Sequence, residues 1–308
     1  MQSSSRRAFL GGRRQASTPW GQFCQRVRRS VQGEFAEFRI EGSAGNARLT
    51  VEDAADIHHV RALCEAYDVI LGLDGLALPA RARELPVVWL RPGKGLARMQ
   101  PVAPGSRKWF VQPGCTLGEL AGAGLRQFAD LPAHLSVAAW LADRSLVDYA
   151  PGRTAASGVE HLSLMLGDGE VVTLGPFGRN DRKALQGLRL QQLVPALFRL
   201  AVRPEWRAGL QAGFWPGRYR LDVLMREDAP INLAQLCLGH GGDLGWVQWL
   251  VLDADAEGMA ASDAPAARYY GGEMLEQMGF ATRAMEMDHE VKSLFDPGRV
   301  LSDPGQQL

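Results

Sequence analysis

The turn Pro113-Gly114 lies where this chain could present bare main chain to a bound group. It follows bulky residues from Trp109 onward, and Thr116 and Glu119 come directly after it. Bulky β-favouring residues predict a strand, Pro-Gly ends it, and Thr116 with Glu119 three residues later has the spacing of a capping box. N–H groups at a helix start lack partners within the helix and can hold an anion or the polar edge of a cofactor. An ordinary strand–turn–helix junction is the alternative.

Three further turns combine small residues with a neighbouring strand or helix. Gly72-Leu-Asp-Gly75 follows a short apolar strand at 68–71, Ser136-Val-Ala-Ala139 opens an apolar helix, and Gly239-His-Gly241 precedes a strand at 246–252. Small residues let main chain approach a bound group closely, and glycine also tolerates positive φ. Each turn is interpreted equally well as a plain turn or a packing surface, and His240 as a structural histidine.

Other chemistry has little support in the sequence. The four cysteines are far apart without a Cys-x-x-Cys pair, and the six histidines have no ligand spacing, so no metal, iron–sulfur centre or disulfide framework is expected. No residue stands out as a catalytic acid or base. The formal net charge of zero gives no argument for nucleic acid, and no apolar run is long enough to span a bilayer.

The elements that would position these turns mix helix and strand. Length and composition, with 308 residues and 46% hydrophobic, allow one large domain or two smaller ones. The cap-like segment Thr50-Val-Glu-Asp53 is expected to open an amphipathic helix, and a hairpin is expected around Gly167-Asp-Gly169. The remaining expected elements are strands at 87–91 and 108–111, a helix to Phe128, hairpin strands at 161–166 and 171–174, and a helical segment at 181–202 broken at Pro195.

The amino-terminal region is basic. From Met1 to Gly33 there are seven arginines and no acidic residue, which predicts either a disordered arm or a basic docking helix around 23–31. Ser5-Arg6-Arg7-Ala8-Phe9-Leu10 resembles a twin-arginine export signal, but glycines and arginines follow in place of an apolar stretch. We therefore expect a cytoplasmic protein that meets membranes only through partners.

Several of these segments resemble one family in the same order. Val111-Gln-Pro-Gly-Cys-Thr-Leu-Gly-Glu-Leu120 resembles the signature of the FAD-binding domain shared by vanillyl-alcohol oxidase, D-lactate dehydrogenase and the glycolate oxidase FAD-binding subunit. Ser136-Val-Ala-Ala-Trp-Leu-Ala142 is similar to the family's Thr-Ile-Gly-Gly-Trp-Leu-Ala, and 232–245 to its Gly-Ser-Glu-Gly-Thr-Leu-Gly segment. The end of the chain, 291–301, resembles the family's closing Leu-Asp-Pro segment.

The resemblance implies an α+β fold: a two-lobed FAD-binding PCMH-type domain with a much reduced cap domain. The chain would then divide into a basic arm at 1–44, the FAD-binding domain at 45–254 with a helical insertion near 178–215, and a residual cap or tail at 255–308. The cofactor implied is non-covalent FAD. The cofactor-binding residues implied are Gly72, Leu73, Asp74, Gly75, Pro113, Gly114, Thr116, Leu117, Gly118, Ser136, Val137, Ala138, Ala139, Gly239, His240 and Gly241.

The first pyrophosphate loop departs most from the family pattern. The family has Gly-Gly-Gly-Thr/His-Ser, whereas Leu73 and Asp74 replace two glycines here, and an aspartate beside a diphosphate is repulsive. Ala138 and Ala139 also replace glycines.

The sequence therefore supports two alternative functions. One is an FAD-dependent oxidoreductase subunit, similar to glycolate oxidase, that oxidises a small 2-hydroxy acid and passes electrons to an iron–sulfur or other oxidoreductase partner. The other is a non-catalytic, flavin-free scaffold or assembly subunit of the same fold.

Overall fold

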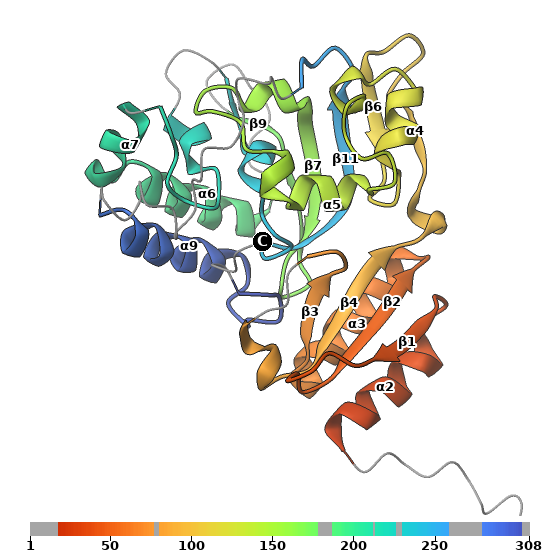
Figure 1. Cartoon of the computed structure of the whole chain (residues 1–308). Helices are drawn as coiled ribbons and strands as arrows, with labels where there is room; N and C mark the ends of the chain where they lie inside the picture. The colour runs from red at the N-terminus through yellow and green to blue at the C-terminus, as the bar shows by residue number, and fades with distance from the viewer. Residues whose placement is uncertain are drawn as a thin grey trace, which may run out of the picture.

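The computed structural model describes residues 18–76, 80–177, 187–211, 213–225, 230–258 and 279–303. These residues form two lobes, one above the other in Figure 1, each built on its own β-sheet. The expected α+β class is confirmed by these sheets and their helices.

The amino-terminal lobe has a four-stranded sheet in the order β1-β2-β4-β3. Its strands β2, β4 and β3 are parallel and β1 is antiparallel at the edge. Parallel strands covered on both faces read as continuous apolar runs, and Val87 to Leu90 are all buried. The elements of this lobe are α2 (Pro19–Ser30), β1 (Phe35–Phe38), β2 (Asn46–Val51), α3 (Ala54–Tyr67), β3 (Ile70–Leu73) and β4 (Val87–Pro92).

The ends of α3 follow local signals. The Asp53 side chain accepts a hydrogen bond from the Ala55 N–H and caps the helix start, whereas Thr50, the first residue of the expected cap-like segment, lies in β2. The helix stops at Asp68, which has left-handed backbone. Upstream, α2 lies in the stretch for which the sequence predicts either a disordered arm or a docking helix. It buries Phe23, Cys24 and Val27.

The second lobe has an antiparallel sheet in the order β5-β6-β11-β7-β8. Its apolar face packs into the largest buried cluster of the protein. In Figure 1 the short helices α4 and α5 lie on the second lobe near β6, β7 and β11. These elements are β5 (Met99–Pro101), β6 (Lys108–Val111), α4 (Leu117–Gly122), α5 (Val137–Ala142), β7 (Val159–Met165), β8 (Val171–Leu174) and β11 (Trp246–Asp253).

Three further helices flank the second sheet on the left of Figure 1: α6 (Leu188–Ala201), α7 (Arg207–Gln211) and α9 (Ala281–Phe295). Pro195 lies inside α6 and does not end it, so the break expected there is not seen. Strands β9 (Pro176–Phe177) and β10 (Ile231–Asn232) form a separate two-stranded sheet. Short 3-10 helices span Ala80–Arg83, Lys94–Leu96, Arg126–Phe128, Arg144–Leu146, Thr154–Ser157, Pro204–Trp206, Leu221–Met225 and Leu233–Cys237.

The lobes share a hydrophobic core where they meet. Met165 and Trp246 of the second lobe belong to the same buried cluster as Leu71, Leu73 and Leu90 of the first. All five side chains are at most 8% exposed. The junction is therefore packed by side chains from both sheets.

No helix among the described residues is long and apolar enough to cross a bilayer.

Candidate functional site

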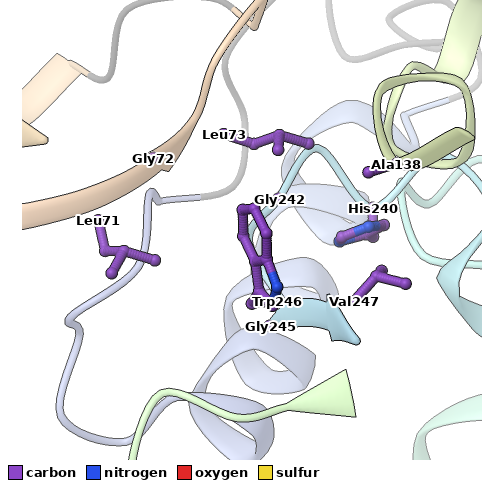
Figure 2. Close-up of a pocket in the computed structure, with 9 residues that line it drawn as sticks. All are labelled: Leu71, Gly72, Leu73, Ala138, His240, Gly242, Gly245, Trp246 and Val247. Atoms are coloured by element: carbon purple, nitrogen blue, oxygen red, sulfur yellow. The ribbon is translucent and has the colours of Figure 1, made fainter. Parts of the chain in front are cut away.

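Three of the four small-residue turns meet at the junction between the lobes. Figure 2 shows the gap there, with His240 and Trp246 facing the space beside Leu73. Its volume is about 10 Å³. The lining residues are Leu71, Gly72, Leu73, Ala138, His240, Gly242, Gly245, Trp246 and Val247. Of the residues named from the sequence, Gly72, Leu73, Ala138 and His240 line the gap.

The signature turn at Pro113-Gly114 does not line the gap, and its donors are used inside the protein. The Gly114 N–H donates to the Leu96 carbonyl at 2.8 Å. The capping box is confirmed: the Thr116 N–H donates to the Glu119 carboxylate at 2.8 Å, and the Glu119 N–H donates back to the Thr116 hydroxyl. The next two N–H groups, of Leu117 and Gly118, donate to Leu135 and Ala133 at 2.8 and 3.0 Å. This helix start therefore has no donors left for an anion.

The segment that opens α5 is bound to the signature turn. The Val137 N–H donates to the Cys115 carbonyl at 2.8 Å, and the Ala138 N–H donates to the Pro113 carbonyl at 3.3 Å. The Ser136 hydroxyl accepts from the Ala139 N–H at 3.2 Å. These donors hold two segments of the second lobe together.

The glycines at 239–242 serve a tight loop against buried arginines. Gly239 and Gly241 have φ of 75° and 65°, where glycine is unstrained. Their N–H groups donate to Leu141 at 2.8 Å and Ala142 at 2.9 Å. A Cβ at Gly239 would collide with Arg144, and one at Gly241 with Arg218. The glycines thus make room for protein side chains.

The loop expected to hold pyrophosphate is part of the first sheet. Gly72 and Leu73 pair with β4 in parallel register, and the Asp74 N–H donates to the Leu90 carbonyl at 2.8 Å. The Asp74 carboxylate lies 3.0 Å from the Arg48 guanidinium, which neutralises it. Gly75 has a φ of 94°, so the turn needs glycine there for its own backbone.

The residues present do not fit an FAD in this arrangement. Ligand pockets for molecules of drug size have volumes of roughly 300–1,000 Å³, whereas a gap of about 10 Å³ is only enough for one water molecule. A diphosphate also needs free main-chain donors, and those of the four turns are largely bonded within the chain. Of the sixteen residues named from the sequence, the structure thus brings a subset to one gap and leaves them no room for the cofactor.

Two polar side chains of the gap have no hydrogen-bond partner among the described residues. They are His240, through both ring nitrogens, and Trp246, through its indole N–H. His240 is 1% exposed, and burial together with the nearby Arg218 lowers its pKa to about 3, so the ring is neutral at pH 7. The sequence singled out His240 but not Trp246, which reads there only as the start of a strand.

Asp243, which follows the gap residue Gly242, belongs to a buried cluster of charges that the sequence did not reveal. Asp243 contacts the Arg218 guanidinium at 3.1 Å and the Tyr219 hydroxyl at 3.2 Å, and burial raises the Asp243 pKa to about 7. Arg220 forms a two-point pair with Asp222 at 2.8 and 2.6 Å. These side chains are nearly or fully buried, so they can hold the loop but cannot meet a substrate from solvent.

Metal chemistry has no support either. Among the residues described, no group of three or more His, Cys, Asp or Glu side chains could hold an ion. All four cysteines are buried free thiols, and burial raises the pKa of each.

No family model and no curated protein matches the chain. Solved structures similar to it include 4-ethylphenol oxidase from Gulosibacter chungangensis (13% identity over 77% of this chain and 43% of that one, TM-score 0.43). Others are BBE-like 1 from Physcomitrella patens (10%, 75% and 44%, TM-score 0.41) and 6-hydroxy-D-nicotine oxidase from Arthrobacter nicotinovorans (11%, 73% and 42%, TM-score 0.39).

This chain spans less than half the length of each of these proteins. Two of the three are oxidases by name. No residue role or activity follows from matches at these TM-scores.

The buried histidine makes stability depend on pH. Folded His240 takes up a proton only near pH 3, whereas in the unfolded chain it does so near pH 6.5. Between these values the unfolded state binds more protons, so acid favours unfolding. Between pH 6.5 and about pH 4.5, the free energy of unfolding should therefore fall by about 2 kcal/mol less in His240→Leu than in the native protein. Urea unfolding at a series of pH values measures this.

The exposed His134 provides the matched control. His134→Leu should follow the pH dependence of the native protein. A His240→Leu curve parallel to the native one would show that His240 is not buried in its neutral form.

Gly114 should be required for packing and not for a cofactor. A Cβ there would lie 2.5 Å from the Gly93 carbonyl oxygen and 2.8 Å from that of Leu96, whereas a Cβ at Gly122 meets nothing within 4 Å. Gly114→Ala should destabilise the protein by about 1–3 kcal/mol through overpacking, and Gly122→Ala should be neutral or stabilising. Thermal unfolding without flavin tests both, and equal midpoints would refute the packing role.

Proposed function

We propose that this chain is a flavin-free scaffold or assembly subunit built on the fold of flavin oxidoreductases. One observation carries the proposal: Leu73, Trp246 and their neighbours pack together at the lobe junction, where three of the family-like turns meet. The gap that remains is about 10 Å³. The domain then contributes a folded surface to an oxidoreductase and not a reaction centre.

A role as a subunit is supported by apolar surface on α6 and α9. Leu188 is 70% exposed at the start of α6, Val202 57% at its end, and Met285 41% on α9. Between the two helices lies a groove of about 610 Å³, lined by residues that include Leu200, Arg203 and Leu294. Leu188, Val202 and Met285 do not line this groove, so the groove itself is the feature that a partner subunit would occupy. The resemblance to the glycolate oxidase FAD-binding subunit favours an oxidoreductase subunit as partner, and a cytoplasmic hetero-oligomer as the assembly.

In the second candidate function, the chain is an FAD-dependent enzyme. The unpartnered His240 and Trp246 lie at the junction where the family-like turns meet, and polar groups without partners are typical of ligand sites. In this case the lobes would separate and the sixteen turn residues would hold a non-covalent FAD. FAD supplies electron transfer when bound, which suits oxidation of a small 2-hydroxy acid with an iron–sulfur partner as acceptor.

The absorption spectrum separates the two functions. The purified protein should be colourless in the visible range, and FAD added in excess should remain removable by gel filtration. Asp74→Gly should not change this result, because Asp74 is paired with Arg48 and its loop is part of the sheet. Stoichiometric retention of FAD by the native chain would overturn the flavin-free proposal and favour the second candidate.

A further inference from the structure

The chain returns from the second lobe to the first at its carboxy-terminal end. Residues 296–302, which we call the C-terminal strap, follow α9 and run beside β3. The Leu71 N–H donates to the Val300 carbonyl at 2.8 Å, and Leu71 forms a parallel bridge with Leu301. Val300 and Leu301 are 5% and 1% exposed and belong to the core cluster of the first lobe. The strap thus adds an isolated parallel bridge to the edge of the first sheet.

The strap is anchored at its start by a buried ion pair. Asp296, with no exposed surface, lies 2.5 Å from the Lys292 ammonium and accepts the N–H groups of Val300 and Leu301 at 3.1 and 2.9 Å. One carboxylate therefore fixes both the end of α9 and the strap's path to β3.

The same lysine reaches the loop at the lobe junction. The Lys292 ammonium donates to the Asp243 carbonyl at 2.8 Å, and Lys292 is 3% exposed. Asp243 is next to Gly242, where an added Cβ would lie 3.2 Å from the Leu73 Cβ, so this loop lies directly against the first lobe. Lys292 and Asp296 hence connect the junction loop, α9 and the edge of the first sheet.

Other polar contacts also join the lobes: Arg81 of the first lobe donates to the Arg299 carbonyl of the strap at 3.3 Å and lies 3.4 Å from the Asp303 carboxylate. The Arg61 side chain donates to the Gly167 carbonyl at 2.9 Å, and His58 lies 3.3 Å from Gln248. The contact surface itself is apolar, with Leu73 and Trp246 on opposite sides. Apolar surfaces separate without leaving unpaired charges, whereas the strap joins the lobes through the Leu71–Val300 hydrogen bond and the ion pair that anchors its start.

We propose that the C-terminal strap is a latch: Lys292 and Asp296 hold it in place, and its release lets the two lobes part along the gap while each lobe stays folded. Release would expose His240, Trp246 and the apolar surface around them. The latch does not depend on whether the closed form binds a cofactor. Its release gives the chain a second, open form that can bind a ligand or a partner.

Thiol labelling at the gap tests the latch. Ala138 lines the gap and is 3% exposed, so a thiol introduced by Ala138→Cys reports opening of the junction. The four native thiols are buried at 0–1% and report global unfolding. Adding Asp296→Ala should raise the labelling rate of the introduced thiol on the order of a hundredfold, with the native thiols still protected.

Glu290→Ala is the matched control, because it removes an ion pair between α9 and Arg203 without touching the strap. It should leave the labelling rate unchanged. Leu301→Ala, which trims the strap's apolar contact with the first lobe, should raise the rate in the same direction but less, and it covers the case in which Asp296→Ala does not fold. Unchanged labelling in the strap variants, or reaction of all five thiols at one common rate, would overturn the proposal.

Discussion

A main-chain N–H group that is buried must find an acceptor, and at the lobe junction of this protein the acceptors come from the chain itself. Pro113 and Cys115 accept from the start of α5, while Leu141 and Ala142 at its end accept from the loop at 239–241. Because the turns are bonded to one another, they form a continuous packed structure in the second lobe. Such turns stabilise the fold, and they leave few donors for a diphosphate.

The side chains at the junction follow from the same constraint. Once the loops lie this close together, little space remains between them, and Leu73 and Trp246 fill it. The glycines that a cofactor loop would use are kept for a different reason, since Gly239 and Gly241 lie against the buried side chains of Arg144 and Arg218. Glycine at these positions is therefore no sign of a bound ligand.

Local signals in the sequence predicted local structure well. The capping box at Thr116 and Glu119, the cap at Asp53 and the hairpin around Gly167-Asp-Gly169 are all present, because each depends on residues a few positions apart. The order of the motifs along the chain also indicated the α+β class. The residues named from these motifs include His240 and Ala138, and the structure places both at one gap.

Contacts between distant residues could not be predicted in this way. Asp74 reads as a repulsive charge in a phosphate loop until Arg48, 26 positions earlier, is seen beside it. The pairing of Lys292 with the Asp243 carbonyl and the path of the strap along β3 depend on the relative placement of the two lobes. A single sequence contains no signal for these contacts, nor for whether the junction is open or packed.

Hydrogen exchange at Ala138, Gly239 and Gly241, with and without saturating FAD, tests the central claim most directly. The bonded N–H groups should exchange slowly in the free protein, and FAD should not change their rates. Rapid exchange in the free protein, with protection when FAD is added, would show that these donors are available to the cofactor and contradict the packed junction.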